Sequence, residues 1–504
     1  MKKLIFIALF GFLFSSISAQ SPCGTNFDES MLERLQHNVG VMDLYRYQRG
    51  GTEYVPLQFH IVADSDGNGA ISETRVFNSL KRLNSNYLSL GIQFYIQNEF
   101  NYLNKDILYS ANTGTNINAI SFQLSLAKVA NAVNVFIVKE ILGAPTPPST
   151  DPTNVLGFYL PSQDVLVLQQ SEVGRENGTF EHEMGHFFSL AHPFRGWDND
   201  PWSADRHGNP VGARSPGNIL NEFVDGSNCS VSGDLICDTP ADYNLGFRWN
   251  GCNDYTGDCM DPSGDTLRPM EINYMGYFIG CDSYQFTPDQ NAAILADFNS
   301  PSRNYIRNDY IPYTGTMDDP QKFNPVDTET FFSSVEFDWE AVEGARWYLL
   351  EIGRNQSITI GAQRYFVTSN SATIDDLIAD RNYFWRVQAY GEYKCYDGDL
   401  SVSSFRTTTT TSTEDPTFVE SFNVFPNPVL NNDFLTINLE SKSRVQMDVE
   451  LFGQNGQVAK RIFGQQINEG GNSFTIDMNG LSAGIYILKM QSAAGNIIRK
   501  ITIL

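Results

Sequence analysis

Basic residues are scarce in this 504-residue sequence. Its 34 lysines and arginines face 58 aspartates and glutamates, which gives a formal charge of −24 at pH 7. Nucleic-acid phosphates and anionic membrane surfaces repel so acidic a chain, so we expect neither as a partner. The same excess of carboxylates suits calcium binding and solubility.

Long apolar runs are also missing. After the N-terminus no run approaches the roughly 18 residues that a membrane-spanning helix needs, so we expect no transmembrane segment in the mature protein. The N-terminus itself has Lys2 and Lys3, an apolar run over Leu4–Phe14, and mostly small residues up to Ala19. This pattern is typical of a signal peptide over residues 1–19, which implies export.

Cysteines are few, and most of them lie together. Export makes disulfides available to the seven cysteines. Because five of them form one cluster, at least one is left unpaired within it, and the sequence does not assign the connectivity. The clustered cysteines are Cys229, Cys237, Cys252, Cys259 and Cys281.

Histidine is scarcer still, but three of the six histidines fall within the eleven residues HEMGHFFSLAH, from His182 to His192. On a helix His182 and His186 lie on one face, where both imidazoles reach a single ion. Catalytic zinc takes three protein ligands and keeps a fourth position open, and His192 is the candidate for the third. We therefore predict that His182, His186 and His192 bind Zn²⁺.

Glu183 directly follows the first of these ligands, so it projects beside the ion. There it can act as the general base that takes a proton from zinc-bound water. A buried amphipathic helix with incidental histidines is the plain alternative, and the placement of Glu183 disfavours it. A second alternative is a downstream glutamate as third ligand, with His192 incidental.

The spacing of the three histidines resembles the H-E-x-x-H-x-x-G-x-x-H motif of metzincin metallopeptidases. The glycine of that motif lies at a bend where positive φ is usual, and here the residue is Ser189. Serine adopts positive φ at some cost, so this turn departs from the pattern while the ligands match it.

A second segment, Asn273-Tyr274-Met275-Gly276-Tyr277, resembles the Met-turn of metzincins. The resemblance implies that Met275 forms an apolar floor beneath the zinc site, and it argues against a glutamate as third ligand. It also implies that the Tyr277 phenol stabilises the oxyanion of the reaction. A core tyrosine is the alternative for Tyr277.

The chain before the histidine motif predicts strands and helices. Val55–Val62 alternates apolar and polar residues, and a helix follows over residues 72–90 with Ser72 as its cap. Between them Asp64–Ile71 imitates an EF-hand loop, but Arg75 replaces the required glutamate, so we expect only a turn. Further expected elements are strands at Val133–Val138 and Val165–Leu168, a substrate-binding edge strand at Leu156–Leu160, and a cap at Thr179 for the histidine helix.

The segment after the signal peptide, residues 20–50, has helical periodicity over Met31–Leu44 but little core of its own, and we predict a propeptide. The thiolate of Cys23 could occupy the open zinc position in a latent form, as in some metzincin zymogens. A surface or disulfide-bonded cysteine is the alternative.

Oxygen donors for a second metal occur after the histidine motif. Asp234, Asp238 and Thr239 lie close together in Gly-Asp-Leu-Ile-Cys-Asp-Thr-Pro and are candidate calcium ligands. His207 lies in the irregular stretch before them and is expected to be a surface histidine.

Together, these features resemble the pappalysin family of metallopeptidases over about Gly50–Ser300. The resemblance implies an α+β metzincin-like catalytic domain with a twisted mixed sheet and an active-site helix at residues 51–305. It also implies zinc, calcium and polypeptide substrates. Some relatives have an aspartate just before the cysteine that follows the Met-turn and prefer basic residues; here the order is Gly280-Cys281-Asp282, so that preference does not carry over.

The rest of the chain predicts two all-β sandwich domains. Short strands at regular intervals in residues 320–408 resemble a fibronectin type III module, which implies a spacer. The strands are Val335–Trp339, Trp347–Ile352 and Tyr383–Tyr390. A linker is expected over Ser300–Pro325, and a second, polar linker over Arg406–Thr417.

Residues 421–504 resemble the C-terminal sorting domain of the type IX secretion system, through Val424-Phe425-Pro426-Asn427-Pro428, Gly480–Lys489 and the ending Arg499–Leu504. The resemblance implies passage to the periplasm, export by the type IX machinery, and release outside the cell or retention at its surface. The sequence thus predicts a secreted zinc endopeptidase. The alternative is a catalytically silent surface adhesin on the same fold, which would not need Glu183.

Overall fold

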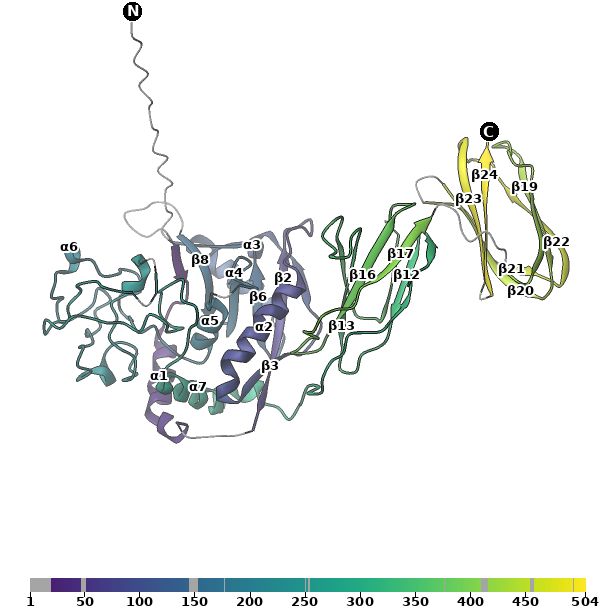
Figure 1. The fold of residues 1–504 in the computed structure, drawn as a ribbon. Coiled ribbons are helices and arrows are strands. Elements are labelled where there is room, and N and C mark those ends of the chain that lie inside the picture. Colours follow the sequence, from purple (N-terminus) through teal and green to yellow (C-terminus); the bar gives the residue numbers. More distant parts are fainter. Residues whose placement is uncertain are drawn as a thin grey trace, which may run out of the picture. The chain divides into compact units, whose positions relative to one another are not determined.

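A computed structural model describes residues 20–46, 51–144, 153–175, 177–249, 251–252, 254–375, 377–408, 416–453, 457–492 and 494–504. The predicted signal peptide lies outside the described residues. The chain divides into a first unit that runs to Thr314 and includes Glu392–Lys394, and a second unit with Gly315–Gly391 and Cys395–Leu504. The first unit is α+β and the second contains β-sandwiches (Figure 1), so the predicted multidomain fold class is confirmed.

A nine-stranded mixed sheet forms the centre of the first unit. Its order is β3-β2-β6-β9-β8-β7-β5, with β4 paired to β2 and β1 paired to β8. Strands β2, β3, β6 and β9 are parallel, while β8 runs antiparallel to β9. The strands are β1 (Gln20–Cys23), β2 (Glu53–Ala63), β3 (Ile92–Ile96), β4 (Asn101–Asn104), β5 (Ser110–Asn112), β6 (Val133–Val138), β7 (Glu140–Gly143), β8 (Thr153–Leu160) and β9 (Val165–Gln169).

Several helices pack against strands of this sheet. In α2 the apolar residues Val76, Leu80 and Leu83 recur at helical spacing, and all three are buried. Among the described residues, no helix is both long and apolar enough to cross a membrane. The α-helices are α1 (Glu29–Val41), α2 (Glu73–Tyr87), α3 (Asp106–Tyr109), α4 (Thr113–Ala127), α5 (Thr179–Phe187), α6 (Ala204–His207) and α7 (Pro288–Asn299); short 3₁₀ turns are η1 (Met42–Leu44), η2 (Leu88–Leu90), η3 (Cys229–Val231), η4 (Leu245–Arg248) and η5 (Pro301–Ile306).

Of the two predicted helix caps, Ser72 is confirmed in position only, and Thr179 is wrong. Ser72 does precede α2, but its hydroxyl lies 3.0 Å from Thr74 Oγ1 and makes no capping bond. Thr179 is inside α5, because Gly178, with φ +81°, is the N-cap. The Thr179 hydroxyl instead donates to Glu172 Oε2 at 3.0 Å, where it helps satisfy a buried carboxylate.

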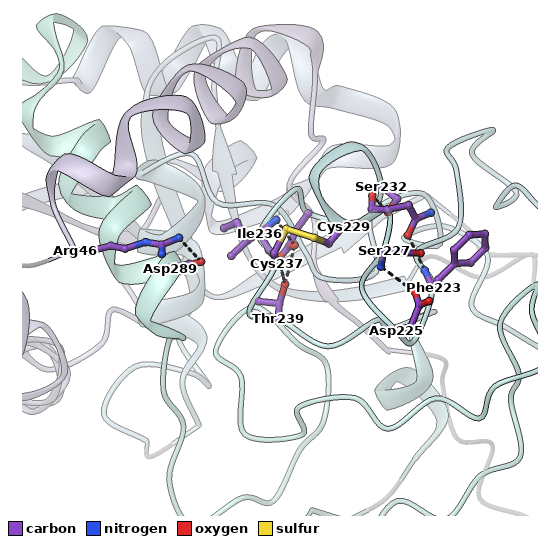
Figure 2. Close-up of a disulfide and its surroundings, with 12 residues drawn as sticks. Arg46, Phe223, Asp225, Ser227, Cys229, Ser232, Ile236, Cys237, Thr239 and Asp289 are labelled. Atoms are coloured by element: carbon purple, nitrogen blue, oxygen red, sulfur yellow. Dashed lines mark hydrogen bonds and ion pairs between the residues drawn. A yellow bond between two sulfur atoms is a disulfide. The ribbon is translucent and has the colours of Figure 1, made fainter.

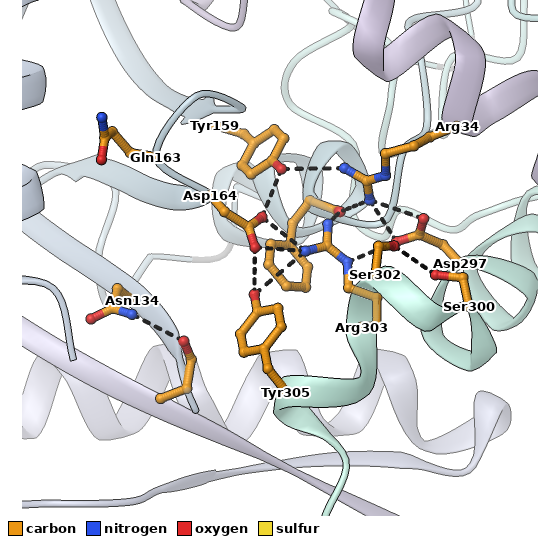
Figure 3. A network of polar contacts seen from close by, with 12 residues as sticks. Arg34, Asn134, Tyr159, Gln163, Asp164, Asp297, Ser300, Ser302, Arg303 and Tyr305 are labelled. Atoms are coloured by element: carbon orange, nitrogen blue, oxygen red, sulfur yellow. Dashed lines mark hydrogen bonds and ion pairs between the residues drawn. The ribbon is translucent and has the colours of Figure 1, made fainter. Parts of the chain in front are cut away.

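The segment after α7, predicted as a linker from Ser300, belongs to the first unit. Arg303 is buried, lies 3.6 Å over the Phe187 ring and donates to both oxygens of Asp164 at 2.8 and 2.9 Å. Arg303 also donates to the Asp297 carboxylate. This carboxylate accepts further hydrogen bonds from the guanidinium group of Arg34 on α1 (Figure 3). A buried charge needs such partners, so this segment folds with the unit and not as a spacer.

The first part of the second unit is a sandwich of two sheets, with orders β10-β12-β15 and β11-β17-β16-β13-β14. Trp339, Trp347 and Trp385 fill its core. The predicted linker begins too early, because Thr407 and Thr408 are buried in β17; residues 409–415 lie outside the described residues. The strands are β10 (Lys322–Asn324), β11 (Glu329–Phe331), β12 (Val335–Trp339), β13 (Trp347–Gly353), β14 (Gln363–Val367), β15 (Ser371–Ile374), β16 (Asn382–Tyr390) and β17 (Ser403–Thr408).

The C-terminal part of the second unit is another sandwich, with sheet orders β18-β19-β22 and β21-β20-β23-β24. Along β19 the side chains of Leu435, Ile437 and Leu439 are buried at every second position. Alternation of this kind makes one face of a strand apolar. The strands are β18 (Val419–Phe425), β19 (Phe434–Ser441), β20 (Val445–Phe452), β21 (Val458–Ile467), β22 (Gly470–Asp477), β23 (Gly484–Ser492) and β24 (Gly495–Ile503).

Candidate metal centre

The structure brings the three predicted histidines together. His182 and His186 extend from α5, and His192 follows the bend after it. Their Nε2 atoms form a triangle with sides of 3.1 Å (His182 to His192), 3.2 Å (His182 to His186) and 3.0 Å (His186 to His192). Among the described residues, this is the one place where three or more histidine, cysteine or carboxylate ligand atoms gather closely enough to hold an ion, and Cys23 is the fourth member.

The opposite ring nitrogen of each histidine faces an oxygen atom. His182 Nδ1 lies 2.6 Å from the Tyr274 carbonyl, and His186 Nδ1 lies 2.8 Å from the Leu190 carbonyl. His192 Nδ1 lies 2.6 Å from Asp198 Oδ1. Each of these oxygens can accept a hydrogen bond from a protonated Nδ1. The lone pair of Nε2 then points at the centre of the triangle.

Burial favours the neutral form of His182 and His186, which is the form that binds metal. All three histidines are buried. Burial, and then the charge of His192, lowers the pKa of His182 to about 3, and the same causes lower the pKa of His186 well below its ordinary value. A metal ion binds neutral imidazole, so His182 and His186 need no deprotonation at neutral pH.

At the bend after α5 this chain has a serine where the metzincin motif has a glycine. Ser189 has φ +71°, and its N–H donates to the His186 carbonyl at 2.9 Å. Its hydroxyl accepts a hydrogen bond of 2.7 Å from Asn38 Nδ2 on α1, and both side chains are buried. A glycine would adopt this φ without strain, but it could not make that bond.

Glu183 is completely buried beside the triangle. Its Oε2 accepts from the Thr25 hydroxyl at 3.0 Å and lies 3.5 Å from Cys23 Sγ, while its Oε1 has no hydrogen-bond partner. Burial raises the pKa of Glu183 to about 8, although the hydrogen bonds from Cys23 and Thr25 lower it. The carboxyl group therefore gains and loses its proton close to neutral pH.

The N-terminal segment covers the predicted edge strand and reaches the site. Strand β1 pairs in parallel with β8, with Cys23 opposite Gly157, and Gly24 N donates to the Gly157 carbonyl at 2.9 Å. The Thr25 hydroxyl accepts from Tyr159 N at 2.8 Å. The Cys23 sulfur and the three histidine nitrogens all lie within 4.8 Å of one another. The N-terminal segment thus pairs with the predicted edge strand and places Cys23 at the open side of the histidine triangle.

Met275 and Tyr277 both lie at the site. Met275 is fully buried below α5, and a Cβ at Gly185 would lie only 2.5 Å from its sulfur, so this glycine permits the close contact. The Tyr277 ring lies 5.0 Å from the His192 ring, and its hydroxyl donates to the Cys23 carbonyl at 3.5 Å. Burial raises the pKa of Tyr277 well above its ordinary value, so the phenol keeps its proton for donation.

The three candidate calcium ligands are not brought together. Asp234 Oδ1 accepts from the Thr239 hydroxyl at 2.8 Å. Asp238 faces α7 instead, where it accepts from Thr287 Oγ1 at 2.6 Å and from Asp289 N at 2.8 Å. His207 contacts Asp200 at 3.2 Å and does not join the histidine triangle.

Two disulfides brace the irregular region that follows the histidines. They join Cys229 to Cys237 and Cys252 to Cys281, while Cys259 is buried and forms no disulfide. Figure 2 shows the first of them together with Thr239, which donates to the Ile236 carbonyl. The cluster therefore leaves one cysteine unpaired, as its odd count requires.

Sequence reasoning missed several side chains at the centre. Asp198 contacts His192, Thr25 contacts Glu183, and Asn38 contacts Ser189. The one available signal was the nearness of Asp198 to the third histidine, since the two are six positions apart. The other two contacts join residues more than 150 positions apart and leave no local pattern.

Comparisons with known proteins agree with this geometry. The chain is 26% identical to an extracellular metalloprotease of Colletotrichum graminicola over 272 residues, which are 51% of this chain and 80% of the relative. It is 25% identical over 255 residues to extracellular metalloproteases of Sordaria macrospora and Neurospora crassa, covering 49% of this chain and 74% of each relative.

Further matches come from solved structures and from a family model. Similar solved structures include the fn3 domain of human collagen alpha-1(XX) chain, with 19% identity, a TM-score of 0.17, and coverage of 20% of this chain and 96% of that one. They also include the chicken CNTN1 FN1–FN3 domains, with 14% identity, a TM-score of 0.16, and coverage of 37% and 65%. Residues 423–504 match the model of the secretion system C-terminal sorting domain. This chain is thus related to extracellular metalloproteases over about half its length, and its C-terminal match indicates that it is secreted.

Proposed function

We propose that this chain is a secreted zinc endopeptidase of the pappalysin type, which hydrolyses peptide bonds in proteins. The observation that carries the proposal is the triangle of three buried Nε2 atoms, each imidazole held through Nδ1 by an oxygen atom. Zinc–nitrogen bonds of about 2.0–2.1 Å in a tetrahedral site separate two ligand nitrogens by about 3.3 Å. The sides of 3.0–3.2 Å fit that requirement.

A zinc ion held by His182, His186 and His192 would lower the pKa of a bound water molecule and polarise the scissile carbonyl. Glu183 is the proposed general base, and its unpartnered Oε1 is free to receive the proton of the attacking water. The same carboxyl group then returns the proton to the leaving amine. The Tyr277 phenol donates to the developing oxyanion, and Met275 supports the histidines from below.

The substrate is a polypeptide that binds in extended form along β8. The Gly157 carbonyl and Tyr159 N–H are the backbone groups that this strand offers, and at present the N-terminal segment uses both. Adding a strand to a sheet edge satisfies the peptide backbone whatever its side chains are. The arrangement therefore suits proteins as substrates more than small molecules.

Residues 20–50 act as a propeptide in this proposal, and Cys23 is the latency residue. Its sulfur lies with the three histidine nitrogens, where a thiolate would be the fourth zinc ligand. Burial and the nearby Glu183 raise the pKa of the Cys23 thiol well above its ordinary value, so it needs a bound cation to ionise. Removal of this segment would open the fourth position and free Glu183 from Thr25.

Calcium is proposed as a second, structural ion near Asp234. Its Oδ2 is buried and has no hydrogen-bond partner. Burial, followed by the charges of Asp234 and Asp242, raises the pKa of the neighbouring Glu222 to about 9, and a bound cation would offset these charges. The proposed calcium ligands would then include Asp234 and Glu222, while Asp238 keeps its hydrogen bonds to Thr287 and Asp289 at the start of α7.

The proposal is tested by replacing Glu183 with glutamine in the full chain and assaying parent and variant after residues 20–50 have been removed by limited proteolysis. Glutamine keeps the shape of the side chain but cannot take up a proton, so we expect one zinc per chain and a turnover of peptide-library substrates lowered by about 10²–10⁴-fold. Metal analysis and digestion of the same preparations give both numbers. Equal rates for the processed parent and the processed variant would refute the mechanism, and a folded, processed parent without proteolysis would favour the adhesin alternative.

A further inference from the structure

His192 differs from the other two candidate ligands in what holds it. His182 and His186 are on α5, and backbone carbonyls accept from their Nδ1 atoms. His192 lies beyond the helix on irregular backbone, and its Nδ1 meets a carboxylate, Asp198 Oδ1, at 2.6 Å. The ligand with the least support from secondary structure therefore has the strongest acceptor.

Asp198 is itself held in place by the turn between the two residues. Its second oxygen, Oδ2, accepts from Gly196 N at 2.7 Å. Gly196 has φ +98°, and a Cβ there would lie 2.4 Å from Ser215 Oγ, so this tight turn requires glycine. Arg195 N donates to the His192 carbonyl at 3.0 Å and closes the turn.

We propose that Asp198 is a positioning residue for the metal ligand His192. Its carboxylate holds the proton on Nδ1, fixes the ring plane and makes Nε2 a stronger donor to a bound cation. The inference rests on the proposed zinc site and adds a residue to it. Partners of this kind typically change metal affinity by about 10–100-fold when they are removed.

The test measures zinc affinity in the full chain by competition with a chromophoric chelator. All variants carry Glu183→Gln, so that none digests itself. Asp198→Ala should bind zinc about 10–100-fold more weakly than this parent, and Asp198→Asn should lose less, because its amide oxygen still accepts from Nδ1. The matched control is Asp200→Asn, which removes a carboxylate that pairs with Arg206 and His207 on the same stretch, and it should leave affinity unchanged.

Thermal unfolding with and without zinc separates positioning from general stability. Positioning predicts that the stabilisation by added zinc shrinks in Asp198→Ala, while the zinc-free protein unfolds much like its parent. Unchanged zinc affinity in Asp198→Ala would overturn the inference, as would equal destabilisation of the zinc-free and zinc-bound forms. If Asp198→Ala does not fold, Asp198→Asn decides on the same criteria. A parent that binds no zinc would instead refute the proposed function.

Discussion

The metal centre and the C-terminal sandwich bury different kinds of side chain. Every residue from Gly178 to Phe194 is buried, including three histidines and two glutamates. In the described part of residues 416–504, the core is apolar and mostly aliphatic, and Ser441 is the one buried polar side chain. Burying a polar group is costly unless a partner satisfies it.

This difference teaches where function is located in the chain. At the metal centre each buried polar group requires a specific partner, often from a distant segment, as Asn38 does for Ser189. The sandwich needs only apolar side chains at alternate positions. Substitutions at the centre should therefore remove chemistry, while those in the sandwich should change stability or export.

The largest expected effect separates the two regions completely. Deleting Ser421–Leu504 should stop the protein at the periplasm and leave its zinc content and peptidase activity intact, because the whole metal centre lies in the first unit. Cell fractionation of the native host, with activity assays on each fraction, measures both. Normal amounts of the truncated protein in the medium or on the cell surface would show that this region is not the sorting signal.

At the centre, Tyr277→Phe removes only a hydroxyl. If the phenol donates to the oxyanion, kcat should fall by about 10²–10³-fold with little change in KM or in zinc content. Steady-state kinetics on one peptide substrate provide the comparison. Tyr255→Phe, which alters a half-buried tyrosine of the same unit, is the control and should keep its rate. A Tyr277→Phe variant with the parental kcat would show that Tyr277 is a core tyrosine and not a donor to the oxyanion.

Asp164 tests the ionic network that supports α5. Burial alone would raise its pKa, but Arg303 and the Tyr305 and Tyr159 hydroxyls hold the pKa below its ordinary value. The ionised Asp164 carboxylate thus contributes fully to stability above its pKa in the unfolded chain, which is about 4. This contribution is lost as the pH falls through the lower pKa that Asp164 has in the folded protein.

We therefore expect Asp164→Asn to destabilise the first unit by about 1–3 kcal/mol at pH 7, and by less below pH 4. Hydrogen exchange followed by mass spectrometry, region by region at several pH values, measures this. A stability loss that is the same at pH 7 and at pH 3 would contradict the assigned ionisation.

The smallest effect belongs to the sandwich core. Ile437 is fully buried in β19, and Ile437→Val removes one methylene group, which should cost about 0.5–1.5 kcal/mol. Exchange should become faster in residues 416–504 only. Faster exchange around His182–His192 in this variant would show that the two regions are not energetically separate.

The sequence was informative where spacing alone brings residues together. His182, Glu183 and His186 lie on one helix, so its period determines their arrangement, and the alternation over Val55–Val62 predicted β2 in the same way. It was uninformative across the irregular stretch after His192. No periodicity there shows that Asp238 faces α7, or that Asp198 turns back to His192.

Long-range polar pairs were equally hidden. Arg303 lies in a segment that reads as a linker, and its burial depends on Asp164, which is 139 residues away. Nothing local indicates such a partner. The apolar core could be predicted from pattern because any apolar neighbour suffices, whereas a buried guanidinium needs a particular carboxylate.

X-ray diffraction from crystals of the purified full chain, recorded on both sides of the zinc absorption edge, tests the central claim most directly. The account predicts one strong anomalous peak, bonded to the Nε2 atoms of His182, His186 and His192, with Cys23 as fourth ligand while the N-terminal segment remains. A fully loaded protein whose zinc lies at other residues, or whose His192 does not contact it, would contradict the account.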